Sequence, residues 1–247
     1  MSGTTRIDRL IANMGYGSRN EIQALARNGR ILLDGAEVDD AGERIAMTPD
    51  LPSRLTIDGQ PLDPLPGLAL MLHKPLGVTC SHKESGPLVY DLLPPRWRRR
   101  DPAISTVGRL DKETSGLLLM TDDGALLHQI ISPKKNVAKH YLATLARPLR
   151  GDEMTLFASG TMMLEGEPKP LAPAKLEIIS AQKARLIVTE GRYHQVRRMF
   201  AAVGNHVEKL HRERVGGLNL PPELPPGGFR LMTTADIAAV FGEDAPG

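Results

Sequence analysis

Cysteine is almost absent from this 247-residue sequence, and long apolar runs are absent too. The single cysteine, Cys80, excludes an internal disulfide and a metal cluster of several thiolates, and we interpret it as a small buried hydrophobic residue. No apolar run approaches the roughly 20 residues that cross a bilayer, and the N-terminal segment MSGTTRIDRL lacks the apolar stretch of a signal peptide. We therefore expect a globular protein of the cytoplasm with no membrane partner.

The short motifs of several common chemistries are also missing. The sequence contains no GxxxxGK[ST] phosphate loop, no GxGxxG turn, no GxSxG nucleophile elbow and no HExxH zinc motif. The histidines are dispersed, and His206 and His211, five residues apart in a predicted strand, would face opposite sides of it. We expect no bound metal and no cofactor, which leaves a candidate site built from Asp, Tyr and Arg side chains.

Positive charge is present in short clusters, although the net charge is only +2. Residues 1–33 hold five arginines against two acids, residues 96–100 read RWRRR, and residues 132–150 hold five basic residues and no acid. Residues 34–66, in contrast, hold eight acids and two arginines. Solvated surfaces can carry such clusters, but clustering of this kind also suits RNA, because phosphates bind Lys and Arg and release counterions.

The first sixty residues predict two short basic helices packed on a small sheet. Apolar residues recur at helical spacing over 7–14, and Ser18-x-x-Glu21 is a capping box that opens a second helix ending before Gly29. Asp34-Gly35 lies between β-prone runs, and LTIDGQPL at 55–62 repeats this hairpin signal. The proline-rich segment PLDPLPG at 61–67 predicts a semi-rigid linker.

The stretch RIDRLIANMGYGSRNEIQALARNGRILLDGAEV resembles the S-four type of RNA-binding module. The resemblance implies that the two helices present basic side chains to RNA, with Asn20 at a position where many members carry another basic residue. Phosphate contact should be somewhat weaker for that reason. We predict an RNA-binding domain over 1–60, the linker over 61–67 and a second domain over 68–242. The expected RNA contacts of the module are Arg6, Arg9, Arg19, Arg27 and Arg30.

The second domain predicts an α+β fold with a mixed or antiparallel sheet, because short strands and helices alternate irregularly along the chain. The predicted strands cover residues 68–72, 103–110, 116–121, 140–145, 175–179 and 185–190. The predicted helices cover residues 124–131, 152–158, 193–203 and 234–241.

Asp111 is the first candidate for chemistry, since it lies in a polar loop just before a buried strand. A partly desolvated carboxylate stays ionised when a cation is near, although Asp in this context also forms simple Asx turns. In the predicted helix EGRYHQVRRMFAAVG, Arg197 falls at the edge of the apolar stripe and Arg198 points to solvent. A half-buried arginine needs a partner, and we predict an ion pair between Arg197 and Asp111. Tyr141 lies in a strand, where it would either pack in the sheet or stack on a base and relay a proton.

Four segments together resemble the pseudouridine synthases of the branch that carries an N-terminal S-four module. They are GRLDKETSGLLLMTDDG, the KPLG of HKPLGVTC, the strand KHYLATL, and EGRYHQVRRMFAAVGNHVEKLHRERVGGLNL. The last segment is most similar to members that act on small-subunit, 16S, ribosomal RNA, and members acting on 23S RNA are the nearest alternative. The resemblance implies a mostly antiparallel sheet flanked by helices, a monomer, and isomerisation of uridine to pseudouridine without a cofactor.

The resemblance also implies roles for individual residues. Asp111 would be the catalytic aspartate, Tyr141 the active-site tyrosine and Arg197 the arginine that forms a salt bridge in the active site. Leu186 or Val188 would pack on the target base. Expected RNA contacts in this domain are Arg109, Lys139, Arg198 and Arg212. Two other functions stay open at this point: a ribosome-associated RNA-binding protein without catalysis, and a nucleic-acid N-glycosidase that uses Asp111 with Glu113.

Overall fold

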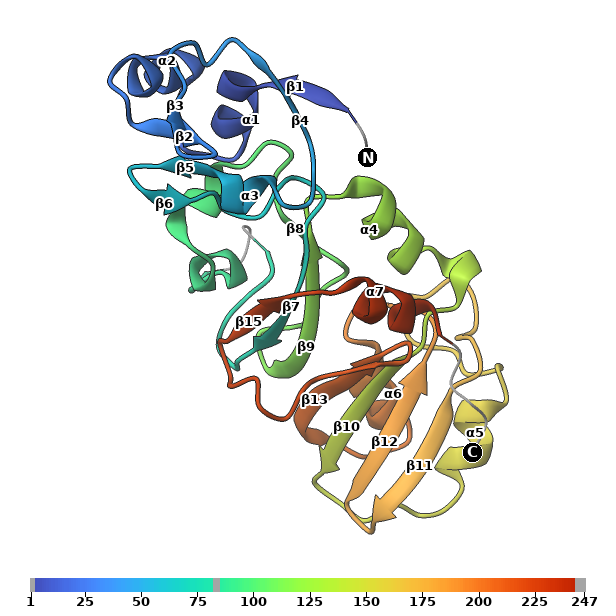
Figure 1. The fold of residues 1–247 in the computed structure, drawn as a ribbon. Coiled ribbons are helices and arrows are strands. Elements are labelled where there is room, and N and C mark those ends of the chain that lie inside the picture. The colour runs from blue at the N-terminus through green and yellow to red at the C-terminus, as the bar shows by residue number, and fades with distance from the viewer. Residues whose placement is uncertain (1–2, 82–84, 243–247) are drawn as a thin grey trace. The chain divides into compact units, whose positions relative to one another are not determined.

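The computed structural model describes residues 3–81 and 85–242 (Figure 1). These residues form two compact units. The N-terminal unit contains the described residues up to Leu68 together with Leu93–Ser105 and Thr121–Asp123, and the second unit contains the rest. The predicted boundaries at residues 60 and 68 stay a prediction. They do not anticipate that residues 93–105 pack with the N-terminal unit, because that packing depends on contacts distant in sequence.

The N-terminal unit combines short helices with a four-stranded sheet of order β3-β2-β5-β6 and a separate β1-β4 pair. Its elements are β1 (Thr4–Arg6), α1 (Ile7–Asn13), α2 (Arg19–Arg27), β2 (Ile31–Leu33), β3 (Ala36–Glu37), β4 (Arg44–Ala46), α3 (Leu51–Arg54), β5 (Leu55–Ile57) and β6 (Gln60–Pro61), followed later in the chain by a 3₁₀ helix η2 (Pro95–Arg99).

Local sequence signals account for this unit. The predicted capping box is present, with the Ser18 and Glu21 side chains each bonded to the other's backbone N–H. Both predicted hairpins turn through Asp-Gly pairs with positive φ at both residues, as type I′ turns require: 52° and 83° at residues 34–35, and 54° and 72° at residues 58–59. The apolar stripe of α1 is buried as predicted.

The second unit is built on a mixed, mostly antiparallel sheet of order β11-β12-β10-β13-β9-β7-β15 (Figure 1). β10 is antiparallel to both β12 and β13, whereas β9 runs parallel to β13. The predicted α+β class is confirmed. The strands are β7 (Ala69–Lys74), β8 (Ser105–Thr106), β9 (Thr114–Thr121), β10 (Lys139–Leu145), β11 (Lys175–Ser180), β12 (Lys183–Val188), β13 (Val207–Val215), β14 (Leu218–Asn219) and β15 (Phe229–Leu231).

The helices of the second unit agree closely with prediction. They are α4 (Gly124–Ile131), α5 (Glu153–Ala158), α6 (Gln195–Ala202) and α7 (Thr234–Phe241), with 3₁₀ turns η1 (Val89–Leu92) and η3 (Pro133–Lys135). The strand predicted over 103–110 is wrong, since only β8 forms and Gly108 turns the chain at φ 72°. β14 and β15 were not among the predicted strands, and β13 was predicted only as the strand around His206 and His211. No helix in the described ranges is long and apolar enough to cross a membrane.

One face of the sheet is covered by helices. Val196, Met199 and Phe200 of α6 and Phe157 of α5 share a hydrophobic core with inward residues of β10, β12 and β13. The strands alternate sides, so the same register that buries these residues also sets which polar side chains point to each face.

Candidate active site

The strand register places five predicted site residues on one face of the sheet. Tyr141 of β10 lies opposite Leu186 of β12 and opposite Arg212 of β13. Lys139, two residues before Tyr141, lies opposite Val188. Residues directly opposite one another in an antiparallel pair share a face, so Tyr141 and Arg212, 71 positions apart in the sequence, meet here. This is the face on which α6 packs.

Asp111 precedes β9 in a loop that hydrogen bonds hold from three directions. The carbonyl of Lys112 accepts from the backbone N–H of Gly77 at 2.9 Å. The carbonyl of Glu113 accepts from the Arg197 guanidinium at 2.9 Å, and the carbonyl of Thr114 accepts from the Lys74 ammonium at 2.8 Å. Three consecutive carbonyls thus receive donors from three separate segments, which fixes the backbone that carries Asp111.

Lys74 is the site residue to which the sequence analysis gave no role, although it begins the KPLG motif. It ends β7, is fully buried, and also donates to the Pro75 carbonyl at 3.0 Å. Burial lowers the pKa of its ammonium, while Cys80, Asp111 and Glu113 act in the opposite direction. Cys80 itself is buried as predicted, and burial raises the pKa of its thiol.

The predicted ion pair between Arg197 and Asp111 is not formed. The Arg197 guanidinium instead donates to the carbonyls of Val207, at 2.7 Å, and of Glu113. Backbone carbonyls can satisfy a half-buried guanidinium as a carboxylate does, and the spacing of residues in the sequence does not distinguish these two kinds of partner. Arg197 therefore contacts the Asp111 loop through its backbone.

His194, which was not among the predicted site residues, contacts the Asp111 side chain. Its Nε2 lies 3.3 Å from Asp111 Oδ1, and both side chains are partly exposed. His194 has φ 48°, an unusual backbone conformation for a residue with a side chain, at the start of α6. Its ring stacks on Tyr193, with centroids 4.0 Å apart, and Tyr193 is 73% exposed. In the sequence, the one indication that Tyr193 and His194 belong to the site was their position inside the motif RYHQVRR.

Arg212 of β13 joins the neighbouring strands β9 and β10 of the sheet. It is buried, and its guanidinium donates to the Leu117 carbonyl at 2.7 Å and to the Tyr141 hydroxyl at 3.3 Å. Burial lowers the pKa of neighbouring Lys139 to about 8, and the charge of Arg212 acts in the same direction. Lys139 also donates to the Thr189 carbonyl at 3.3 Å.

The remaining predicted residues of this unit differ in accessibility. Arg109 is exposed in the loop before Asp111. Arg198 does not point to solvent as predicted, since its guanidinium donates to Glu167 at 2.9 Å and to the carbonyls of Tyr193 and Glu165. Leu186 and Val188 are 0% and 3% exposed and belong to the hydrophobic core in this structure.

In the N-terminal unit, ion pairs occupy three of the five arginines predicted to bind RNA. Arg6 and Arg19 both bind the buried carboxylate of Asp8, at 2.9 and 3.0 Å. Arg30 binds Asp58 through two hydrogen bonds. Exposed Arg9 and Arg27 form no ion pair with any residue in the described ranges.

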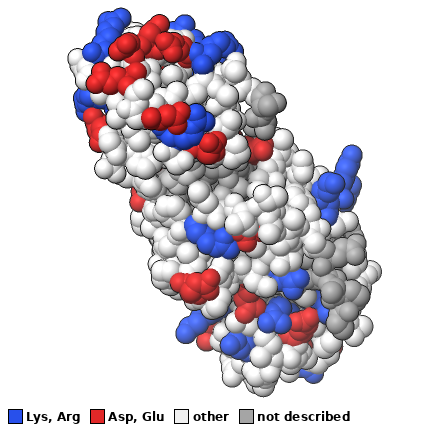
Figure 2. All heavy atoms as spheres, in the orientation of Figure 1, with Lys and Arg blue, Asp and Glu red and all other residues white. Residues whose placement is uncertain are grey.

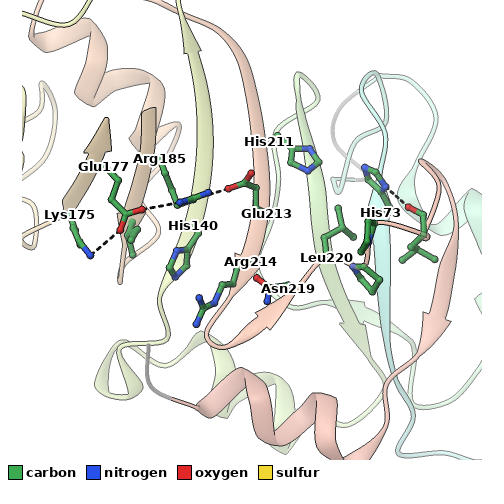
Figure 3. Close-up of a pocket in the computed structure, with 14 residues that line it drawn as sticks. His73, His140, Lys175, Glu177, Arg185, His211, Glu213, Arg214, Asn219 and Leu220 are labelled. Atoms are coloured by element: carbon green, nitrogen blue, oxygen red, sulfur yellow. Dashed lines mark hydrogen bonds and ion pairs between the residues drawn. The ribbon is translucent and has the colours of Figure 1, made fainter. Parts of the chain in front are cut away.

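The opposite face of the sheet carries a groove of about 910 Å³ (Figure 3). A row of charges crosses it, in which Lys175 contacts Glu177 and Arg185 bridges Glu177 and Glu213. The proposed catalytic side chains Asp111, Tyr141 and Arg197 do not line it. No three His, Cys, Asp or Glu side chains among the described residues come together in a way that could hold a metal ion.

Comparison with known proteins identifies the family. Residues 69–202, more than half of the chain, match the RNA pseudouridylate synthase family. The chain belongs to this family. Residues 5–47 match the S4 domain, which confirms the predicted S-four module.

Relatives of this synthase share almost its full length. The ribosomal small subunit pseudouridine synthase A of Escherichia coli strain K12 is 41% identical over 95% of this chain and 99% of its own. An uncharacterized RNA pseudouridine synthase of Bacillus subtilis, YtzG, is 39% identical over 94% of this chain and 96% of its own. A solved pseudouridylate synthase structure, 34% identical, covers 95% of this chain and 99% of its own with a TM-score of 0.66.

Proposed function

We propose that the protein converts a uridine of small-subunit, 16S, ribosomal RNA to pseudouridine, with Asp111 as its catalytic residue and without a cofactor. The choice of small-subunit RNA is supported by the name of the E. coli relative and by its near full-length identity. A synthase of large-subunit RNA is the alternative. The proposed place of action is the cytoplasm, where bacterial ribosomal RNA is found.

The reaction breaks the bond between N1 of uracil and C1′ of the ribose, turns the base, and forms a bond from C5 to C1′. Asp111 can act on C1′ as a nucleophile, or it can assist loss of the base through an elimination intermediate. Either route needs a carboxylate held at a fixed position beside a base that has left its stack. The observation that supports Asp111 is the loop before β9, whose three carbonyls are held by Gly77, Arg197 and Lys74.

The other residues have supporting roles in this proposal. Tyr141 lies on the sheet face beside the site, with its hydroxyl held by Arg212, so its ring can stack on the base or its hydroxyl can move a proton. Arg197 positions the Asp111 loop. Lys139 and Arg109 supply positive charge toward the phosphates of the RNA, and we propose that the protein acts as a monomer.

The test is conversion of uridine labelled with tritium at C5 in transcribed ribosomal RNA, because formation of the C5 glycosidic bond releases that hydrogen. We expect Asp111→Asn to bind RNA like the wild type and to release no tritium above background. Glu113→Gln, in the same loop, is the matched control and should retain activity. Undiminished release by Asp111→Asn would refute the proposed role, and free uracil in place of pseudouridine would identify a glycosidase.

A further inference from the structure

The RWRRR segment lies in the N-terminal unit and not with the sheet that surrounds it in sequence. It forms η2, and three contacts attach this turn to α1 and to the chain that follows the S4 domain. The Arg96 guanidinium lies 3.9 Å above the ring of Tyr16 and donates to both carboxylate oxygens of Asp63. The backbone N–H of Asp101 donates to the Asn13 carbonyl at 2.8 Å.

The approach of η2 to the helical pair is very close at Gly15. This glycine lies in the turn between α1 and α2 with φ 88°, and a Cβ atom there would be 2.5 Å from the Arg96 carbonyl oxygen. The Arg99 Cβ would be only 3.2 Å from the same position. A residue with a side chain cannot occupy this position without moving η2, so the contact depends on glycine.

A buried ion pair fixes the other end of the segment. Arg100 binds Asp122 at 2.9 Å, with both side chains 1% exposed. Arg100 also donates to the Pro64 carbonyl, and Asp122 accepts from the Gly67 N–H at 2.8 Å. Because Trp97 is buried as well, η2 is held on both sides, and the side chains of Arg98 and Arg99 remain exposed.

Several arginines of the S4 domain are paired with acidic residues of the N-terminal unit. Arg6 and Arg19 share Asp8, and Arg30 is paired with Asp58, so much of the module's positive charge is neutralised. Figure 2 shows acidic and basic side chains interspersed on the visible face of the N-terminal unit. Arg99 forms no ion pair with a described residue.

Arg99 nevertheless lies near the α1–α2 turn. Hydrogen bonds from Ser18 hold the pKa of Glu21 below its usual value, and the charge of Arg99 acts in the same direction. Arg9 lies one helical turn before Asn13 on α1, the residue whose carbonyl receives the Asp101 N–H. Arg99 therefore borders the α1–α2 turn, and exposed Arg9 lies on α1 about one helical turn before the end of that helix.

We propose that η2 extends the RNA-binding surface of the S4 domain, with Arg98 and Arg99 binding phosphates of ribosomal RNA beside Arg9. The match to the S4 domain ends at residue 47, so this surface uses a segment far outside it. RNA is the partner that fits, because guanidinium groups bind phosphate oxygens strongly and the protein belongs to an RNA-modifying family. The identity of that RNA as ribosomal rests on the proposed function.

The experiment measures binding of the full-length protein to transcribed 16S RNA over a range of salt concentrations. We expect Arg98→Ser/Arg99→Ser to weaken binding by roughly 10- to 30-fold near 0.1 M salt and to reduce the slope of log affinity against log salt by about 1 to 2. Arg98→Lys/Arg99→Lys should retain most of the affinity. The matched control, Lys183→Ser/Lys209→Ser, removes two exposed charges elsewhere and should leave both quantities unchanged.

The proposal is overturned if the Arg98→Ser/Arg99→Ser variant keeps the affinity and salt slope of the wild type. It is also overturned if the control variant loses as much RNA affinity as that variant does. Thermal unfolding of each variant shows that it is folded, and the single charge reversal Arg99→Glu gives a second measurement that should weaken binding further. Pseudouridine formation is measured separately. A wild type that binds RNA but isomerises nothing refutes the proposed function alone, whereas an active wild type with unchanged variant binding refutes this proposal alone.

Discussion

At the scale of single residues, the site is defined by donors that fix backbone carbonyls more than by ion pairs. Asp111 pairs with no arginine in the part of the chain that the structure describes; its loop is held by Lys74, Arg197 and the N–H of Gly77. Positioning of a reacting group within a fraction of an ångström is a large part of catalysis, so residues that only hold the loop should affect turnover.

Lys74→Met tests this positioning role. The substitution keeps an unbranched side chain in the buried space but removes the donor to the Thr114 carbonyl. We expect kcat to fall by about 10- to 100-fold with KM nearly unchanged, because the aspartate is displaced while the RNA contacts remain. Lys112→Met, in the same loop, is the control. A rise in KM with unchanged kcat would instead assign Lys74 to substrate binding.

Lys139 gives a pH prediction. Its pKa of about 8 means that the side chain is cationic below pH 8 and neutral above it, whereas an unperturbed lysine remains charged to above pH 10. If Lys139 binds phosphate as proposed, RNA affinity falls as the pH is raised from 7 to 9. Lys139→Met should bind more weakly at pH 7 and show a smaller fall over that range. Titration of RNA binding by fluorescence anisotropy measures both, and identical pH profiles would refute the contact.

At the scale of secondary structure elements, the close approach of β9 and β13 is the critical contact. These are the parallel strands that join the Asp111 loop to Arg212. At Gly116, which has φ 114°, a Cβ atom would be 2.2 Å from the Arg212 carbonyl oxygen. Only glycine allows this spacing without displacement of the neighbouring backbone.

Gly116→Ala is therefore expected to reduce the free energy of unfolding by about 2 to 4 kcal/mol, through the clash and the strained φ together. Gly124→Ala is the matched control: Gly124 begins α4, and nothing lies within 4 Å of its Cβ position. That variant should be neutral or slightly more stable, because alanine favours the helix. Chemical denaturation measures both, and equal stability of the two variants would contradict the argument.

At the scale of the whole molecule, the chain combines an S4 domain, which is a type of RNA-binding module, with a domain of an RNA-modifying enzyme family. The S4 domain and the RNA pseudouridylate synthase domain match separate parts of the chain, at residues 5–47 and 69–202. The chain covers nearly the full length of its relatives, so both functions are expected in one polypeptide.

The substrate can be identified in cells. We expect deletion of the gene to remove one or a few pseudouridines from 16S ribosomal RNA and to leave 23S RNA unchanged, and reintroduction of the wild-type chain, but not of Asp111→Asn, to restore them. Pseudouridine mapping by chemical labelling and sequencing measures this. Loss from 23S RNA alone would instead identify a large-subunit enzyme.

The sequence by itself determined the local elements and the family. The capping box at Ser18 and Glu21 and the Asp-Gly turns act within a few residues, and they formed as predicted. The α+β class and the pseudouridine synthase family could also be predicted from the sequence, because both depend on the order of elements and motifs along the chain. The predicted roles of Asp111, Tyr141 and Arg197 stay predictions that the proposed experiments test.

Only the tertiary structure decided which partners those residues have. Arg197 donates to backbone carbonyls, His194 contacts Asp111, and Asp122 forms a buried pair with Arg100. The packing of the RWRRR segment in the N-terminal unit is likewise decided only by the tertiary structure. Periodicity specifies which face of an element is buried, but any carbonyl or carboxylate in reach can satisfy a buried cation, and the choice among them depends on how distant segments pack.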